Sequence, residues 1–180
     1  MKKSTRYVTL SALLCALVFV SVFTASLWPT GQLAIIAFAS LFIAAAVIEM
    51  GIAQGLQVYV VSSLLCLLIL PNKVDALLHI IFFGYYPIVK SLVERRRNTI
   101  VQWVLKLLVF NAALFAALFF FSEVFIFPGS IAPAQWIIYT CGSAIFAFYD
   151  YGYTKLIWLY MYRVHSKANL RTSSQWNGKD

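Results

Sequence analysis

The stretch of sequence that decides the fold runs from Tyr7 to Ile48 and reads YVTLSALLCALVFVSVFTASLWPTGQLAIIAFASLFIAAAVI. It contains no Asp, Glu, Lys or Arg, and further apolar stretches follow it almost to the C-terminus. The hydrocarbon core of a bilayer is about 30 Å thick, and roughly 20 apolar helical residues cross it. The sequence therefore predicts an integral membrane protein.

The composition leaves no room for a soluble catalytic domain. Of the 180 residues, 62% are hydrophobic and 11% are charged. We therefore expect any function to lie within the membrane or at its edges.

Breaks in the apolar sequence predict an all-α bundle of six transmembrane helices. The breaks lie at Trp28–Gly31, around Gly51, at Pro71–Lys73, at Glu94–Asn98 and at Phe127–Ser130. The predicted spans cover residues 7–27, 32–50, 52–70, 74–93, 99–121 and 134–161. Without the break at Gly51, a helix over residues 32–70 would be about 58 Å long, which is far more than a bilayer needs. Residues 1–165 are predicted to form the transmembrane domain and residues 166–180 a basic, polar cytoplasmic tail.

Basic residues indicate the orientation, because cytoplasmic loops are enriched in Lys and Arg. In a six-span layout every basic cluster falls on one side, which predicts that both termini are cytoplasmic. The clusters are Lys2, Lys3 and Arg6 before the first span, Arg95, Arg96 and Arg97 after the fourth, and Arg163, Lys167, Arg171 and Lys179 after the sixth. We interpret the net charge of +8 as this topology signal and not as a nucleic-acid-binding surface.

The N-terminus also has features of a secretory signal peptide, because basic residues precede an apolar stretch that ends at Thr24-Ala25-Ser26. That stretch is longer than the apolar core of about 7 to 15 residues in a cleaved signal, so we favour a retained anchor. Cleavage would leave the orientation of the other spans unchanged.

The sequence lacks the spacings that catalytic and metal sites need. Its two histidines, His79 and His165, are far apart, and no GxxxxGK[ST] loop or HExxH motif occurs. Cys15, Cys66 and Cys141 form no CxxC pair and are predicted to be small packing residues. We predict that the chain is not an enzyme and holds no metal or cofactor, and that any ATP hydrolysis comes from a partner.

Polar side chains inside a membrane are costly and often functional. The predicted spans contain Glu49, His79, Lys90, Lys106, Asn111, Asp150 and Lys155. Lys90 and Lys155 lie near the cytoplasmic interface, where we expect their ammonium groups to snorkel to water. Lys106 lies deeper, so we expect it to pair with Glu49 or Asp150, with a ligand or partner contact as the alternative.

Aromatic and polar residues gather at the predicted outer level of the bundle. They are Trp28, Asn72, His79, Trp136 and Tyr139, with Asn111 placed deeper as a floor. Aromatic walls with a few polar groups are typical of small-ligand sites, so these residues are predicted to line an outward-facing substrate pocket. An interfacial aromatic belt is the alternative for the aromatic members. Pro87 interrupts the fourth span and is expected to kink it.

Two alanines mark one face of the first span. Ala12 and Ala16 lie four residues apart, beside Ser11. Small-xxx-small spacing lets membrane helices approach closely, although such pairs also arise by chance in alanine-rich segments.

Taken together, these features resemble the substrate-binding S components of energy-coupling factor (ECF) transporters, the vitamin-uptake relatives of ABC importers. The likeness lies in the chain length, the six-helix layout, the basic start leading into SALLCAL at Ser11–Leu17, and the Pro-Gly-containing loop before the small apolar helices of residues 31–70. In that family an AxxxA face on the first helix docks on a transmembrane coupling protein, and Ala12 and Ala16 match this pattern.

The resemblance implies a multi-pass subunit of the bacterial plasma membrane, surrounded by lipid, that binds a vitamin-like, water-soluble micronutrient from outside. It also implies that two ABC-type ATPases power uptake through the coupling protein. No signature for riboflavin, thiamine, biotin or folate is present, so the substrate stays open. The alternative is a non-transporting bacterial membrane scaffold or assembly protein whose polar residues hold its helices together.

Overall fold

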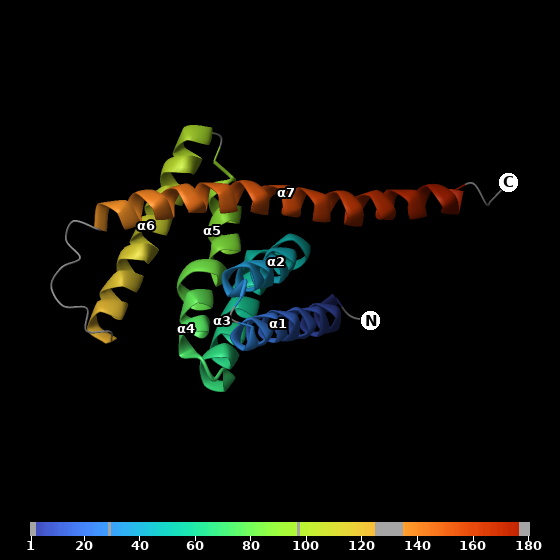
Figure 1. Cartoon of the computed structure of the whole chain (residues 1–180). Coiled ribbons are helices and arrows are strands. Elements are labelled where there is room, and N and C mark those ends of the chain that lie inside the picture. Colours follow the sequence, from blue (N-terminus) through green and yellow to red (C-terminus); the bar gives the residue numbers. More distant parts are fainter. Residues whose placement is uncertain (1–2, 29, 97, 125–134, 177–180) are drawn as a thin grey trace. The chain divides into compact units, whose positions relative to one another are not determined.

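The computed structural model describes residues 3–28, 30–96, 98–124 and 135–176. Within these ranges, the side chains of residues 3–4, 119–124, 135–136, 138 and 164–176 are not described. The described residues form helices and contain no strand (Figure 1). The prediction of an all-α protein is thereby confirmed, while the predicted break at Phe127–Ser130 lies outside the described residues.

The helical elements follow one another through short connections. They are α1 (Lys3–Leu27), α2 (Gln32–Met50), α3 (Ile52–Ile69), α4 (Lys73–Leu78), the π-helix η1 (His79–Gly84), α5 (Tyr86–Val93), α6 (Thr99–Val124) and α7 (Gln135–Trp176). Within the described residues, five stretches are long and apolar enough to cross a membrane: Thr5–Leu27, Gln32–Met50, Ile52–Ile69, Lys73–Val93 and Thr99–Leu118. This is the pattern of a multi-pass membrane protein.

The predicted sixth span covers residues 134–161; residue 134 lies outside the described residues, and residues 135–161 belong to α7. This helix has 42 residues and continues to Trp176, through most of the segment that the sequence assigned to a polar tail. A helix of that length extends about 63 Å, so no helix end marks where a span would leave the bilayer. The count of six spans and the cytoplasmic termini stay predictions.

The chain forms two compact units, residues 1–139 and residues 140–180. The first contains α1 to α6, and the second consists of the remainder of α7. Each unit is described by itself below.

Backbone geometry at three short connections explains where the helices of the first unit begin and end. Gly31 (φ 84°, ψ 10°) precedes α2, and Gly51 (φ 96°, ψ 172°) separates α2 from α3. Both lie at positive φ, which glycine adopts without steric cost. Asn72 caps α4, because its side-chain Oδ1 accepts a hydrogen bond from the Val74 amide at 3.1 Å. The break predicted at Gly51 is therefore confirmed.

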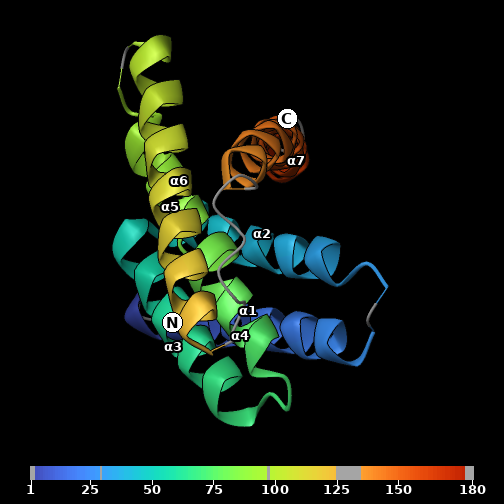
Figure 2. The ribbon, with the colours of Figure 1, turned by 60° about the vertical axis from the view of Figure 1, so that its left-hand side comes forward.

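Small residues bring the first three helices together. α1, α2 and α3 contact one another, and Figure 2 shows α1 and α2 joined by their short connection. Ala39 and Ala46 of α2 are fully buried. At Gly55 of α3, an added Cβ would lie 2.2 Å from Cγ2 of Val47, so only glycine allows this approach between α2 and α3.

The fourth span is irregular at its middle. α4, η1 and α5 follow one another from Lys73 to Val93, contact α2 and α3, and place Pro87 in the first turn of α5. The sequence predicted a kink at Pro87, and the structure adds a π-helix that begins eight residues before it, at His79. π-helical turns are rare and are frequent at functional sites.

Candidate functional site

A buried polar cluster lies where α2 begins and the fourth span begins. Asp75 stands in the first turn of α4 and is 0% exposed. The Gln32 amide nitrogen donates a hydrogen bond to Asp75 Oδ1, while Oδ2 has no hydrogen-bond partner among the described residues. The N-terminal end of a helix favours a negative charge, which is one reason for an acidic residue at this position.

His79 lies one helical turn after Asp75. Its backbone N–H bonds to the Asp75 carbonyl oxygen, and its φ of −61° and ψ of −48° are helical, so the two side chains share a face. The imidazole is 0% exposed, and neither Nδ1 nor Nε2 has a partner within the described part of the chain. We call Gln32, Asp75 and His79 the polar cluster.

Tyr59 of α3 packs beside this cluster. Its ring centroid lies 6.5 Å from that of His79, and its hydroxyl donates a hydrogen bond to the carbonyl oxygen of Ile80 at 3.0 Å. This bond ties α3 to the first turn of the π-helix. The cluster is thus built by α2, α3 and the fourth span.

The other residues of the predicted pocket have different surroundings. Trp28 is 65% exposed, and Asn72 uses its side chain to cap α4. Asn111 is half-buried and donates to the Leu107 carbonyl oxygen of its own helix at 2.8 Å. Tyr139 is half-buried in α7, and the side chain of Trp136 lies outside the described side chains. Of the predicted set, His79 is the residue that the structure places in the polar cluster.

A groove of about 490 Å³ lies between α1 and α3. Ala12 and Ala16 form part of its α1 wall, and both are exposed. Two glutamines, Gln54 and Gln57, add polar groups from α3 to a lining that is otherwise mostly apolar. Because small side chains leave the groove open, an apolar helix or chain could approach the α1 backbone there.

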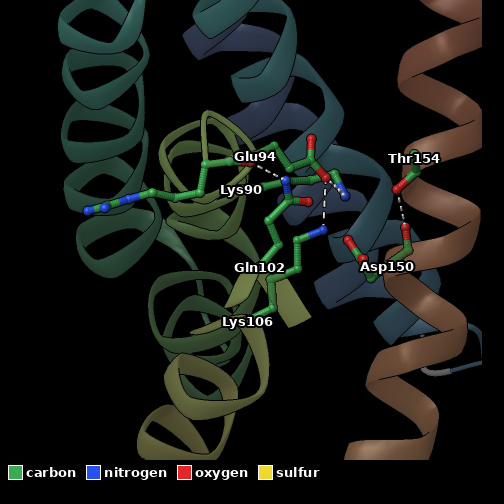
Figure 3. A network of polar contacts seen from close by, with 7 residues as sticks. Lys90, Glu94, Gln102, Lys106, Asp150 and Thr154 are labelled. Atoms are coloured by element: carbon green, nitrogen blue, oxygen red, sulfur yellow. Dashed lines mark hydrogen bonds and ion pairs between the residues drawn. The ribbon is translucent and has the colours of Figure 1, made fainter. Parts of the chain in front are cut away.

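A charged cluster joins α5 to α6 at the opposite end of the fourth span (Figure 3). One carboxylate oxygen of Glu94, Oε1, lies 2.8 Å from the ammonium nitrogens of both Lys90 and Lys106. Gln102 closes the connection by donating to the Arg96 carbonyl oxygen at 2.6 Å. These contacts clamp the turn between the two helices.

Glu94 is the partly exposed member of this cluster, with 39% of its side chain accessible. Burial alone would raise the pKa of Glu94. Hydrogen bonds from Lys106 and Lys90, together with their positive charges, outweigh that effect and lower the pKa of Glu94 below its ordinary value of 4.5. The carboxylate is therefore charged at neutral pH.

One expectation for a lysine differs from the structure. Lys90 does not reach water, because it is 2% exposed and its ammonium meets Glu94 one turn later. Because a carboxylate lies within reach, the Lys90 ammonium does not need to extend to water. Lys106 also pairs with Glu94, a partner that the sequence did not suggest, and its ammonium nitrogen lies 5.8 Å from the centre of the Trp103 ring. The expected pairing of Lys106 with Glu49 or Asp150 stays a prediction.

The remaining residues that were singled out from the sequence have the following surroundings. Cys15 and Cys66 are buried, as expected of packing residues, whereas Cys141 is exposed. Glu49 is exposed near the end of α2. Within α7, the Thr154 hydroxyl donates to the Asp150 carbonyl oxygen at 2.7 Å (Figure 3). The Lys155 ammonium nitrogen lies 5.6 Å from the centre of the Tyr151 ring.

Sequence reasoning missed Gln32, Asp75 and Glu94 as site residues. It placed Glu94 in the break between the fourth and fifth spans and singled out neither Asp75 nor Gln32 for a site. The spacing of Asp75 and His79, four residues apart in one helix, was the signal that could have added Asp75 to the site. No family model matches the chain, and no curated protein or solved structure is significantly similar to it.

Proposed function

We propose that this chain is the substrate-binding membrane subunit of an uptake system for a small, water-soluble, vitamin-like nutrient. The observation that carries the proposal is the polar cluster of Gln32, Asp75 and His79. Three of its atoms, Asp75 Oδ2 and both ring nitrogens of His79, have no hydrogen-bond partner among the described residues. The likeness of the sequence to ECF S components points to the same role.

The energetics of burial separate a binding site from a structural one. Buried polar groups are nearly always hydrogen-bonded, and each one left unpaired costs about 1 to 3 kcal/mol. A cluster whose task is to hold helices together would use its hydrogen bonds for that purpose. A cluster with unused donors and acceptors can regain the cost when a solute supplies the partners.

Access to the cluster requires movement of the surrounding helices, since Asp75 and His79 are 0% exposed. The π-helix His79–Gly84 begins at the cluster itself, and π-helical turns commonly mark functional sites. We propose that this segment moves when the solute enters. Trp28, Asn72, Asn111, Trp136 and Tyr139 stay candidates for the walls of the entry path.

The groove between α1 and α3 is the proposed docking site for a transmembrane coupling protein, which would work with two partner ATPases. Ala12 and Ala16 line it and are exposed, as close helix approach needs. Ala16→Leu should weaken assembly with the coupling protein and leave solute binding intact. Ala34→Leu, at an exposed alanine of α2, is the matched control. Normal assembly of the Ala16→Leu protein would mean that the groove has another use.

Purification in gentle detergent, followed by mass spectrometry of what the protein retains, tests the function. We expect one tightly held small molecule, and a co-purifying membrane protein with ATPase subunits. If the folded protein holds no small molecule while a large protein partner co-purifies, the scaffold function replaces the transport function.

A further inference from the structure

Asp75 is a carboxylate without a cationic partner on the described part of the chain. It is 0% exposed, and its hydrogen bond comes from the neutral amide of Gln32. Lys73, two residues earlier, donates instead to the carbonyl oxygens of Leu67 and Leu70 at 2.7 and 2.9 Å. A charged carboxylate in an apolar interior is costly unless a positive charge or a proton accompanies it.

Among the described side chains, the helices that contact α4 bring no other positive charge to the carboxylate. α1 and α2 carry no charged residue from Tyr7 to Ile48. Lys90 lies roughly 20 Å further along the fourth span and pairs with Glu94. From α3, Tyr59 faces the cluster with a neutral hydroxyl that is already bonded. His79 is therefore the basic group beside the carboxylate.

We propose that the polar cluster binds a protonated nitrogen, so that the solute is an organic ammonium ion. This inference rests on the proposed solute-binding function. An ammonium group brings the missing positive charge to Asp75 and N–H donors for Oδ2 and for one His79 ring nitrogen. Neutral imidazole accepts at one nitrogen and donates at the other, so His79 also holds an acceptor on the same solute.

The test uses three probes of matched size and different charge: ethanolamine, ethylene glycol and glycolate. Each is added at about 20 mM to the full-length protein in detergent at neutral pH and equal ionic strength, against a dissociation constant of about 1 mM for so small a cation. Ethanolamine should raise the Tm by roughly 4 to 7 °C, and the neutral and anionic probes should not. Equal shifts for all three probes, or no shift for ethanolamine, would overturn the proposal.

Substitutions of single residues test whether the ethanolamine-induced rise in Tm comes from binding at the polar cluster. Asp75→Asn should abolish the ethanolamine shift, and Glu49→Gln, at an exposed carboxylate, should keep it. A retained shift in Asp75→Asn overturns the proposal. If Asp75→Asn does not fold, His79→Leu takes its place: loss of the ring nitrogen that accepts from the ammonium group should reduce the ethanolamine shift, and an undiminished shift overturns the proposal.

Different experimental results would refute the proposed solute-binding function and the proposal of an ammonium ion. A neutral or acidic small molecule retained by the purified protein would refute the ammonium ion and leave solute binding standing. No retained molecule, together with no probe shift, would refute both.

Discussion

Gly84 sets how closely the fourth span approaches α3. A Cβ atom added there would lie 2.7 Å from Cε2 of Tyr59 and 2.9 Å from the His79 carbonyl oxygen. The Tyr59 ring is held, because its hydroxyl bonds the carbonyl oxygen of Ile80. The backbone atom cannot yield cheaply either, so this position beside the polar cluster requires glycine for space.

Gly84→Ala should therefore lower the free energy of unfolding by about 1 to 3 kcal/mol, as overpacking of a tight contact does. Gly152→Ala in α7 is the matched control, since an added Cβ there meets nothing within 4 Å. Alanine favours a helix over glycine, so the control should be neutral or more stable by up to about 1 kcal/mol. Thermal unfolding in detergent compares the two, and equal loss of stability in both would contradict the packing account.

Single residues also show where sequence reasoning reaches its limit. His79 could be selected from the sequence because a histidine inside an apolar span stands out. Gln32 could not, because its partner Asp75 lies 43 residues away and only the packing of α2 against the fourth span joins them. Periodicity gives the face of a helix, while a side-chain partner depends on helix rotation and depth.

At the scale of the helical elements, the clamp of Lys90, Glu94 and Lys106 holds α5 to α6. The carboxylate serves two ammonium groups that are 2% and 5% exposed. Removing one partner of a buried ion pair is costly, because the charges left behind lose their counter-ion. The partial exposure of Glu94 reduces that cost through solvent screening.

Glu94→Gln should lower the free energy of unfolding by about 1 to 3 kcal/mol at neutral pH. Because the pKa of Glu94 is lowered in the folded state, its contribution is fully present above the ordinary value of 4.5 and is lost as pH falls through the lower folded value. The difference between wild type and Glu94→Gln, followed by thermal unfolding against pH, should thus be constant near neutrality and shrink in acid. A difference that grows in acid would contradict the clamp, and Lys106→Met added to Glu94→Gln should restore part of the loss.

The helices themselves were largely predictable. Apolar length and the Gly and Pro breaks set the ends of α2 and α3 to within one residue of the structure. The π-helix was not predictable, since it depends on Gly84 fitting under Tyr59 and on the Tyr59 bond to Ile80. The same holds for the length of α7, because polar residues after the last apolar stretch give no signal that ends a helix.

At the scale of the whole molecule, the membrane class follows from composition, but the orientation rests on charge distribution alone. We predict that both termini are cytoplasmic. In a background without Cys15, Cys66 and Cys141, a cysteine introduced at Ser130 should react with an impermeant maleimide added to intact cells. One introduced at Ser173 should react only after the membrane is opened. The reverse labelling would contradict the orientation.

The central claim is that a solute occupies the polar cluster, and native mass spectrometry of wild type beside His79→Leu tests it most directly. Leucine removes two unpaired ring nitrogens with little change of volume, so the variant should unfold at an equal or higher temperature. The account predicts that wild type and the control Ser62→Ala, whose hydroxyl already bonds the Tyr59 carbonyl oxygen, carry the solute mass, and that His79→Leu does not. A stable His79→Leu protein with the same bound mass as wild type would contradict it.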